Sequence, residues 1–340
     1  MYKSAQWIIG LAISLAALAW AFREVSLPAL AEALSRANYL YALPALGLIL
    51  IGQMARARSW QTILGRGVPF WRVFGALNAG YLLNNVLPFR LGEVGRAYLI
   101  SRTHKLTAAQ ALSSVLVERV IDLVMIMSLL TAFLPIITGL EWTRSAALIS
   151  ALVTLVALTG LFVLARSHNS VTRIIHWALS HVRWPGFAPQ VWSERSGRFI
   201  EGLAVLQDVR RFVAAAFWSS LAWVCAGFSA WMLILAFVPT GTIAMGFFML
   251  VITGLSIAVP SAPGSVGVWQ AAGVSALGVF GVTGGLAFSI SLVHHLVNYG
   301  FTSLLGAIGL AREGESLAHL AQSARAMLGE KEPKARDVVS

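Results

Sequence analysis

The sequence predicts an all-α polytopic membrane protein built from two inverted-topology repeats. Hydrophobic residues make up 58% of the 340 residues and charged residues only 11%, whereas soluble domains carry about 25% charged residues. The mean hydropathy of +0.76 agrees with this interpretation. A Pro-x-x-x-Gly-x-Val-Gly pattern occurs at 88–95 and again at 260–267, each time inside a long apolar run. Pro and Gly at equal offsets in apolar segments of both halves indicate broken membrane helices.

Six apolar runs have a length that fits a membrane helix, which needs about 20 residues. They lie near 5–22, 39–54, 112–135, 145–165, 212–237 and 286–310. Two further apolar regions, 74–101 and 242–282, contain the Pro/Gly breaks. The first is too short for two crossings, so we expect a re-entrant pair of half-helices. The second fits either a re-entrant pair or two thin spans.

Each break has its own hinge residues. Pro lacks a backbone N–H donor, and Gly allows turns and close approach of the backbone to a ligand. The predicted hinges are Pro88, Gly92 and Gly95 in the first half, and Pro260, Pro263, Gly264 and Gly267 in the second.

Loop charges predict the orientation. The 55–73 loop carries Arg56, Arg58, Arg66 and Arg72 without an acid, and the 166–211 loop is also rich in arginine. Because cytoplasmic loops carry an excess of Lys and Arg, we place both loops and both termini in the cytoplasm. The expected location is the cytoplasmic (inner) membrane.

Counting crossings from these loops gives two halves of opposite orientation. Repeat one covers about 39–135 and repeat two about 212–310, with 5–22 as an additional N-terminal helix and 145–165 as a connector. A single transmembrane domain is therefore expected over 1–312. We expect no separate soluble domain.

The cytoplasmic parts are basic, and the formal net charge is +11. We expect the 166–211 loop to contain an amphipathic helix at 170–184, and 313–340 to contain a second one followed by a disordered tail. Anionic lipid headgroups are the predicted partners of these basic segments. An ordinary loop helix without a membrane role is the alternative. Nucleic acid is not expected, since no soluble basic fold is present to bind it.

The first break carries the charges that best suit a ligand site. Arg90, Glu93 and Arg96 follow Asn84 and Asn85 in an apolar region. Charges inside a bilayer cost several kcal/mol and mark function, while a half-helix N-terminus and the arginine fork both suit phosphate. These residues predict a phosphate-binding site. The alternative is that Glu93 pairs with Arg90 or Arg96 only to hold the fold.

Polar residues also recur further along both halves. Glu118, Arg119 and Asp122 follow Ser113-x-x-x-Val117, and His294, His295 and Asn298 follow Ser289-x-x-x-Val293. For the first group we consider a proton-coupling carboxylate or a structural Arg119–Asp122 pair. For the second group we expect contacts to a headgroup or packing against the charges of the first half.

No metal or other cofactor is predicted. Adjacent histidines point about 100° apart on a helix, and their neighbours Ser291 and Asn298 are not typical zinc ligands. The single cysteine, Cys225, excludes an intrachain disulfide and is expected to be inert packing.

Three ordered motifs carry a resemblance to a known family. They are Asn85-Val-Leu-Pro-Phe-Arg-Leu-Gly-Glu-Val-Gly-Arg96, then Glu118-Arg-Val-Ile-Asp122, then Pro260-Ser-Ala-Pro-Gly-Ser-Val-Gly267. Together they resemble the flippase-like family, which includes the membrane half of lysylphosphatidylglycerol synthases. The likeness covers roughly residues 5–312.

The resemblance implies that a lipid or lipid-linked sugar is moved between leaflets. By motif position it makes Arg90, Glu93, Arg96, Glu118, Arg119 and Asp122 the functional residues. The second half departs from the family, with Gln270 where Glu is common and His295 near where Arg is common. No soluble aminoacyl-transfer domain follows, so lipid aminoacylation is not expected.

Three hypotheses follow from these features. The first is a translocase for an anionic lipid, with the headgroup contacting Asn85, Arg90, Glu93, Arg96, Glu118, Arg119, Asp122, His294, His295 and Asn298. The second is a small-solute transporter or a non-transporting partner of a lipid-processing complex. The third is an intramembrane lipid-modifying enzyme, which we do not favour because Ser101-Arg-Thr-His104 lacks a suitably spaced downstream His and acid. The substrate, the direction, the energy source and the oligomer are not indicated.

Overall fold

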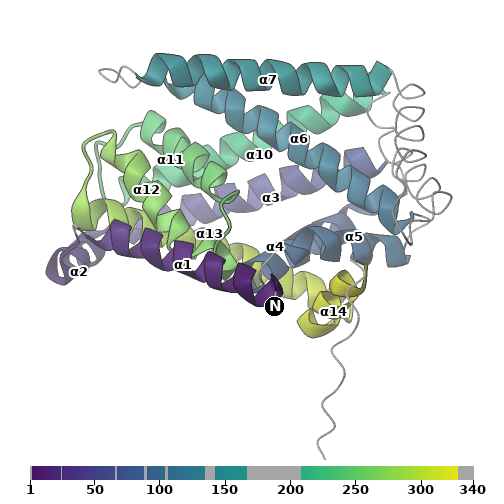
Figure 1. The fold of residues 1–340 in the computed structure, drawn as a ribbon, viewed down its shortest axis with the longest axis horizontal. Coiled ribbons are helices and arrows are strands. Elements are labelled where there is room, and N and C mark those ends of the chain that lie inside the picture. Colours follow the sequence, from purple (N-terminus) through teal and green to yellow (C-terminus); the bar gives the residue numbers. More distant parts are fainter. Residues whose placement is uncertain are drawn as a thin grey trace, which may run out of the picture.

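The structure is a computed structural model that describes residues 2–23, 25–65, 67–87, 90–103, 106–134, 142–166 and 208–327. This part of the chain is all-helical, with twelve α-helices and two short 3-10 helices. Most of the long helices run from side to side in the view of Figure 1. The elements are α1 (Tyr2–Phe22), α2 (Leu27–Arg36), η1 (Tyr39–Tyr41), α3 (Ala42–Leu64), α4 (Phe70–Val86), α5 (Leu91–Thr103), α6 (Ala108–Phe133), α7 (Trp142–Arg166), α10 (Val209–Leu235), α11 (Ile243–Ser256), η4 (Pro263–Ser265), α12 (Val268–Gly278), α13 (Gly284–Arg312) and α14 (Leu317–Met327).

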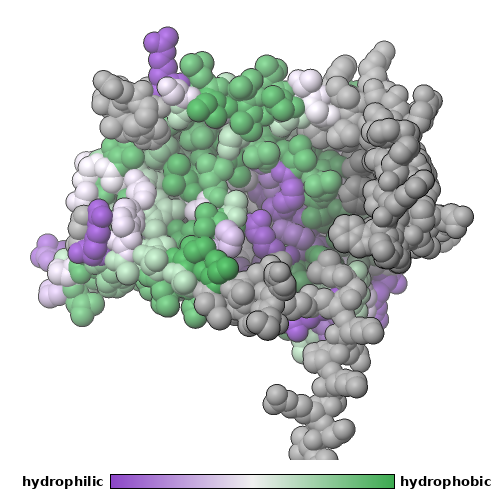
Figure 2. All heavy atoms as spheres, viewed as in Figure 1, coloured by the Kyte–Doolittle hydropathy of each residue, from purple (hydrophilic) through white to green (hydrophobic). Residues whose placement is uncertain are grey.

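The surface suits a lipid environment. Within the described residues, two helical stretches are long and apolar enough to cross a membrane, Tyr39–Leu64 and Val209–Leu235. The helices Ile9–Phe22 and Leu27–Arg36 meet at 80° and add a third span if they are counted as one. Hydrophobic residues cover much of the coloured part of the face seen in Figure 2, and large apolar side chains of α7 such as Leu152 point outward. The other predicted spans form α6, α7 and α13.

Both predicted helix breaks are confirmed. The first separates α4 from α5, and the second separates α11 from α12. Arg90 in the first break has a φ of 52°, and Gly264 and Gly267 in the second have φ values of 71° and 86°, which glycine adopts without strain. Pro88 lies outside the described residues.

The second broken region consists of two short helices. Helix α11 has 14 residues and α12 has 11, and a crossing needs about 20. Helices α11 and α12 lie together at the left of Figure 1, whereas α4 and α5 lie together toward the right. Each broken pair therefore occupies one end of the bundle.

Helix α3 is longer than predicted. We expected a span at 39–54 followed by a cytoplasmic loop at 55–73, but α3 continues to Leu64. The reason is that Arg56 does not need water, because its guanidinium lies 2.7 Å from a carboxylate oxygen of Asp122 inside the bundle. Arg58 points outward on the same helix and donates to Gln61. The loop boundary at residue 55 was wrong.

Helix α1 packs against the second break. The backbone N–H of Ala262 donates to the Ser14 hydroxyl at 2.8 Å. Gly267 lies so close to α1 that an added Cβ would sit 2.2 Å from the carbonyl oxygen of Ser14. The N-terminal helix therefore fixes the position of the second break.

Of the two amphipathic helices predicted for the cytoplasmic side, the structure describes one. The 170–184 helix and the tail after residue 327 lie outside the described residues. Helix α14, the second predicted amphipathic helix, buries Leu320 and Ala324 in the core cluster that also contains Leu91 and Leu99 of α5. Its apolar face thus packs on protein.

Candidate functional site

Two adjoining cavities lie between the broken helices. The polar cavity has a volume of about 390 Å³ and is lined by residues of both halves, among them Gln53, Arg56, Tyr81, Asn84, Asn85, Arg90, Glu93, Arg119, Asp122, Trp223, Trp269, Asn298 and Tyr299. The apolar cavity has a volume of about 590 Å³ and is lined by α1, the first break and residues 257–265. The two share Asn84, Arg90, Ile257, Ala258 and Ser265. Figure 2 shows hydrophilic atoms recessed within the otherwise hydrophobic face.

A buried ion-pair network forms one wall of the polar cavity. Its members are three arginines and three carboxylates from α3, α5 and α6. Asp122 accepts from Nη1 of Arg56 at 2.7 and 2.8 Å, and Glu118 accepts from Nη1 of Arg96 at 2.7 Å. Arg119 lies between Asp122 and Glu93, with its Nη1 3.4 Å from a carboxylate oxygen of Asp122 and its Nε 3.6 Å from a carboxylate oxygen of Glu93. The network residues are Arg56, Glu93, Arg96, Glu118, Arg119 and Asp122.

The network has no net charge, since three arginines face three carboxylates. Glu118 and Arg96 are 1% exposed and Asp122 is 4% exposed. An unpaired ion at such a depth costs several kcal/mol, so each partner is required by the others. The indole N–H of Trp223 also donates to Asp122 at 2.9 Å, and the Arg96 guanidinium lies 4.6 Å from the Trp60 ring centre. The wall is therefore neutral, and two tryptophans pack against it.

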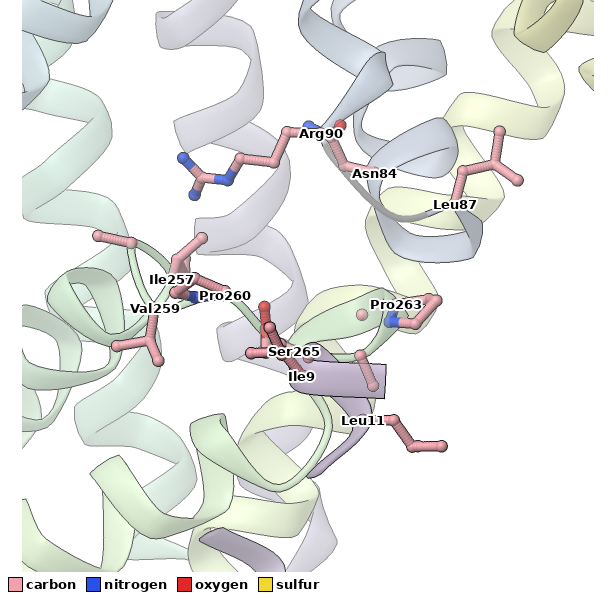
Figure 3. A pocket seen from close by; sticks show the side chains of 15 residues that line it. Ile9, Leu11, Asn84, Leu87, Arg90, Ile257, Val259, Pro260, Pro263 and Ser265 are labelled. Atoms are coloured by element: carbon pink, nitrogen blue, oxygen red, sulfur yellow. The ribbon is translucent and has the colours of Figure 1, made fainter. Parts of the chain in front are cut away.

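Arg90 is different from these arginines. It is exposed and lies in the break before α5. Its backbone carbonyl accepts from the N–H of Glu93 at 3.3 Å, but its side chain forms no hydrogen bond or ion pair with another described residue. Figure 3 shows its side chain extended across the apolar cavity toward Ile257 and Val259. Arg90 also lines the polar cavity. A free guanidinium thus stands at the junction of the two cavities.

The asparagines of α4 have structural partners. The Asn84 side-chain oxygen accepts from the backbone N–H of Gly92 at 2.7 Å, which satisfies a free donor at the start of α5. Asn85 donates to the Ser303 hydroxyl at 2.8 Å and so connects α4 to α13. Asn298 lines the polar cavity close to Tyr299.

The histidines lie in the second half, apart from the ion-pair network. His295 contacts the Gln270 amide at 2.8 Å and the carbonyl oxygen of Gly264 at 2.9 Å, and it stacks on Trp269. His294 is 1% exposed and its Nδ1 has no hydrogen-bond partner. Neither histidine is among the residues that line either cavity. Their visible role is to hold η4 and α12 against α13.

The hinge glycines serve close packing. A Cβ on Gly92 would lie 1.9 Å from the carbonyl oxygen of Gly80, and one on Gly95 would lie 2.8 Å from Leu83. Both positions let α5 contact α4 rather than opening space for a ligand. Pro260, Pro263 and Gly264 do line the apolar cavity. In the described part of the chain, no group of three or more His, Cys, Asp and Glu residues is placed to hold a metal ion.

Comparison with known proteins agrees with this architecture. The model of the lysylphosphatidylglycerol synthase TM region family matches residues 7–306. The chain belongs to this family.

A relative of the chain is also a membrane protein by its name. The UPF0104 membrane protein MJ1595 of Methanocaldococcus jannaschii is 22% identical over 303 residues, which is 84% of this chain and 88% of the relative. Both the family match and this relative extend over almost the whole helical bundle. The chain is therefore a multi-pass membrane protein of the lysylphosphatidylglycerol synthase TM region family.

Four residues of the site were not predicted from the sequence. Arg56, Gln53, Tyr81 and Trp223 line the polar cavity, but none was a predicted site residue. The sequence did contain one indication that Arg56 lies within the membrane. The predicted span 39–54 is shorter than the roughly 20 residues that a crossing needs, and extending it brings Arg56 into the membrane. The role of Trp223 as a donor to Asp122 has no sequence signal, because the two residues are 101 positions apart.

Because the network is neutral, we expect Asp122→Asn to lower the free energy of unfolding strongly. The change leaves one surplus positive charge in a buried site, which typically costs about 3–5 kcal/mol. Adding Arg56→Met removes that charge, so the double variant should recover most of the loss. The measurement is unfolding in uncharged detergent. Glu32→Gln, which breaks the exposed Arg36–Glu32 pair, is the control and should cost at most about 1 kcal/mol. A double variant no more stable than Asp122→Asn would contradict the neutrality requirement.

Proposed function

We propose that the chain translocates an anionic lipid or lipid-linked sugar across the cytoplasmic membrane, with the headgroup phosphate bound by Arg90. The observation that carries this proposal is the position of Arg90, an unpaired guanidinium at the junction of a polar and an apolar cavity. An amphiphile with a phosphate between head and tail matches that arrangement. Its head would occupy the polar cavity and its hydrocarbon the apolar one.

The arginine fork suits this task. A guanidinium is permanently charged and donates two parallel hydrogen bonds to phosphate oxygens. Arg96 and Arg119 have the same chemistry, but both are already engaged with carboxylates of the network. Arg90 is therefore the residue we assign to the substrate, and Arg96 and Arg119 keep the wall in place.

The contacts between helices support an internal repeat of four helices, whose two copies the proposed orientation places in opposite directions across the membrane. If α3, α4, α5 and α6 are exchanged for α10, α11, α12 and α13, the contacts of one half map onto those of the other. Contact α3–α4 maps onto α10–α11, α5–α6 onto α12–α13, and α4–α13 onto α11–α6. Transporters with such repeats alternate access by moving one repeat against the other around a central site. The cavities lie between the two broken pairs, where this movement would expose them in turn.

Transport is a better fit than catalysis. A general acid or base needs a carboxylate that is free to exchange a proton with substrate. Glu118 and Asp122 are instead each held by an arginine at 2.7 Å. The same pairing argues against proton coupling through either carboxylate. We therefore propose a translocase that is not an enzyme.

A liposome assay tests the assignment of Arg90. Purified protein carrying Arg90→Ala should move fluorescent or radiolabelled anionic phospholipid at least roughly tenfold more slowly than the parent, because charge-assisted hydrogen bonds to phosphate are lost. Arg58→Ala, which removes an exposed arginine from α3, should leave the rate unchanged. Transport by Arg90→Ala at the parental rate would refute the assignment.

Cysteine labelling tests the proposed orientation, in which both termini and the connection between α3 and α4 are cytoplasmic. Two exposed positions at opposite ends of the bundle are suitable, Ser316 before α14 and Thr240 between α10 and α11. In a Cys225→Ser background, Thr240→Cys should react with a membrane-impermeant thiol reagent in intact cells, and Ser316→Cys should react only after lysis. The reverse pattern would invert the topology.

A further inference from the structure

The charges around the polar cavity do not balance once Arg90 is counted. The network contributes three arginines and three carboxylates, and its members Arg56, Glu93, Arg119 and Asp122 line the cavity. Arg90 lines the cavity as well, and its side chain forms no hydrogen bond or ion pair with another described residue. Four arginines against three carboxylates leave a surplus of one positive charge. The site is thus set up to receive one negative charge.

A second charge on the ligand would have no partner here. Interactions between charges are strong in surroundings of low dielectric constant, and an uncompensated charge is correspondingly costly. A dianionic headgroup would leave one negative charge unmatched. An ammonium group would have to compete with arginines for carboxylates that are already paired, such as Asp122 at 2.7 Å from Arg56.

The uncharged side chains that line the polar cavity include hydrogen-bonding groups without a partner. Two of its side chains carry buried polar atoms without a hydrogen-bond partner, the Gln53 side-chain oxygen and the Trp269 indole N–H. One is an acceptor and the other is a donor. A hydroxyl group can donate to an acceptor of the first kind or accept from a donor of the second, whereas an ammonium only donates and an ionised phosphate only accepts. Aromatic rings of Tyr81, Trp223 and Tyr299 also line the cavity, together with aliphatic side chains of both halves.

We propose that the polar cavity selects an amphiphile with a single phosphodiester charge whose head beyond the phosphate is uncharged and hydroxylated. Phosphodiester-linked glycerol, inositol or a sugar belongs to this class. The inference rests on the proposed function for the location of the headgroup. It restricts the ligand to one negative charge and to an uncharged, hydroxylated headgroup. Translocation of anionic lipids in general requires neither restriction.

Competition binding in uncharged detergent tests the selectivity. A fluorescent phosphatidylglycerol is bound to the purified full-length chain and displaced by unlabelled lipids with matched acyl chains. Phosphatidylglycerol should compete at least roughly tenfold better than phosphatidylethanolamine, which carries an ammonium, or cardiolipin, which carries two phosphates. It should also exceed phosphatidic acid, which has no head beyond its phosphate. Equal competition by any of the three lipids would overturn the proposal.

Two variants separate charge selection from head selection. Arg90→Gln should abolish the preference for phosphatidylglycerol over phosphatidylethanolamine. Gln53→Leu should weaken phosphatidylglycerol binding by roughly fivefold, the effect of one lost hydrogen bond, and should narrow its advantage over phosphatidic acid. Arg58→Gln is the charge-matched control and should change neither ratio. Unchanged ratios in both cavity variants would place the binding site elsewhere.

The outcomes distinguish this inference from the proposed function. Selective binding through Arg90 without measurable transport in liposomes would refute translocation and leave the charge selection intact. Transport that depends on Arg90, together with equal binding of phosphatidylglycerol and phosphatidylethanolamine, would refute the charge selection and leave translocation intact.

Discussion

The neutral ion-pair network of α3, α5 and α6 is the interaction on which the rest of the site depends. Six charges in a membrane protein are tolerable only because each guanidinium faces a carboxylate, at 2.7 Å in the two closest pairs. The network joins the first broken pair to the long helices on either side of it. It thereby fixes the start of α5, and with it the position of Arg90. Arg90 differs from the three network arginines because each of them is paired with a carboxylate and the Arg90 side chain is not.

The second half of the molecule supplies shape and uncharged contacts. His295, Gln270 and Trp269 pack around η4 and the start of α12, and α1 holds the same break from the other side through Ser14. The two breaks are therefore related in backbone form but different in chemistry. One presents a charge to the cavity, while the other presents apolar side chains, backbone and an indole. This asymmetry suits an amphiphile, which has one charged end and one apolar end.

Much of the fold could be predicted from the sequence because membrane helices and their breaks have local causes. Long apolar runs predict helices, and Pro260, Pro263, Gly264 and Gly267 predict the second break without knowledge of their neighbours. The end of α3 could not be predicted in this way. Arg56 resembles a cytoplasmic arginine until its partner 66 residues away is known. The same limit applies to the site, where Arg90, Arg96 and Arg119 are chemically alike and only the partners seen in the structure distinguish the free one.

In the mechanism we propose, Arg90 alone supplies the charge that binds a lipid phosphate between the two broken helix pairs. Native mass spectrometry of gently extracted protein measures this directly, since it reports the mass of any lipid retained. The parent should retain one lipid whose mass fits a phosphodiester with an uncharged, hydroxylated head, and Arg90→Gln should lose it while Arg58→Gln keeps it. Retention of the same lipid by Arg90→Gln, or retention of a zwitterionic lipid by the parent, would contradict the role of Arg90.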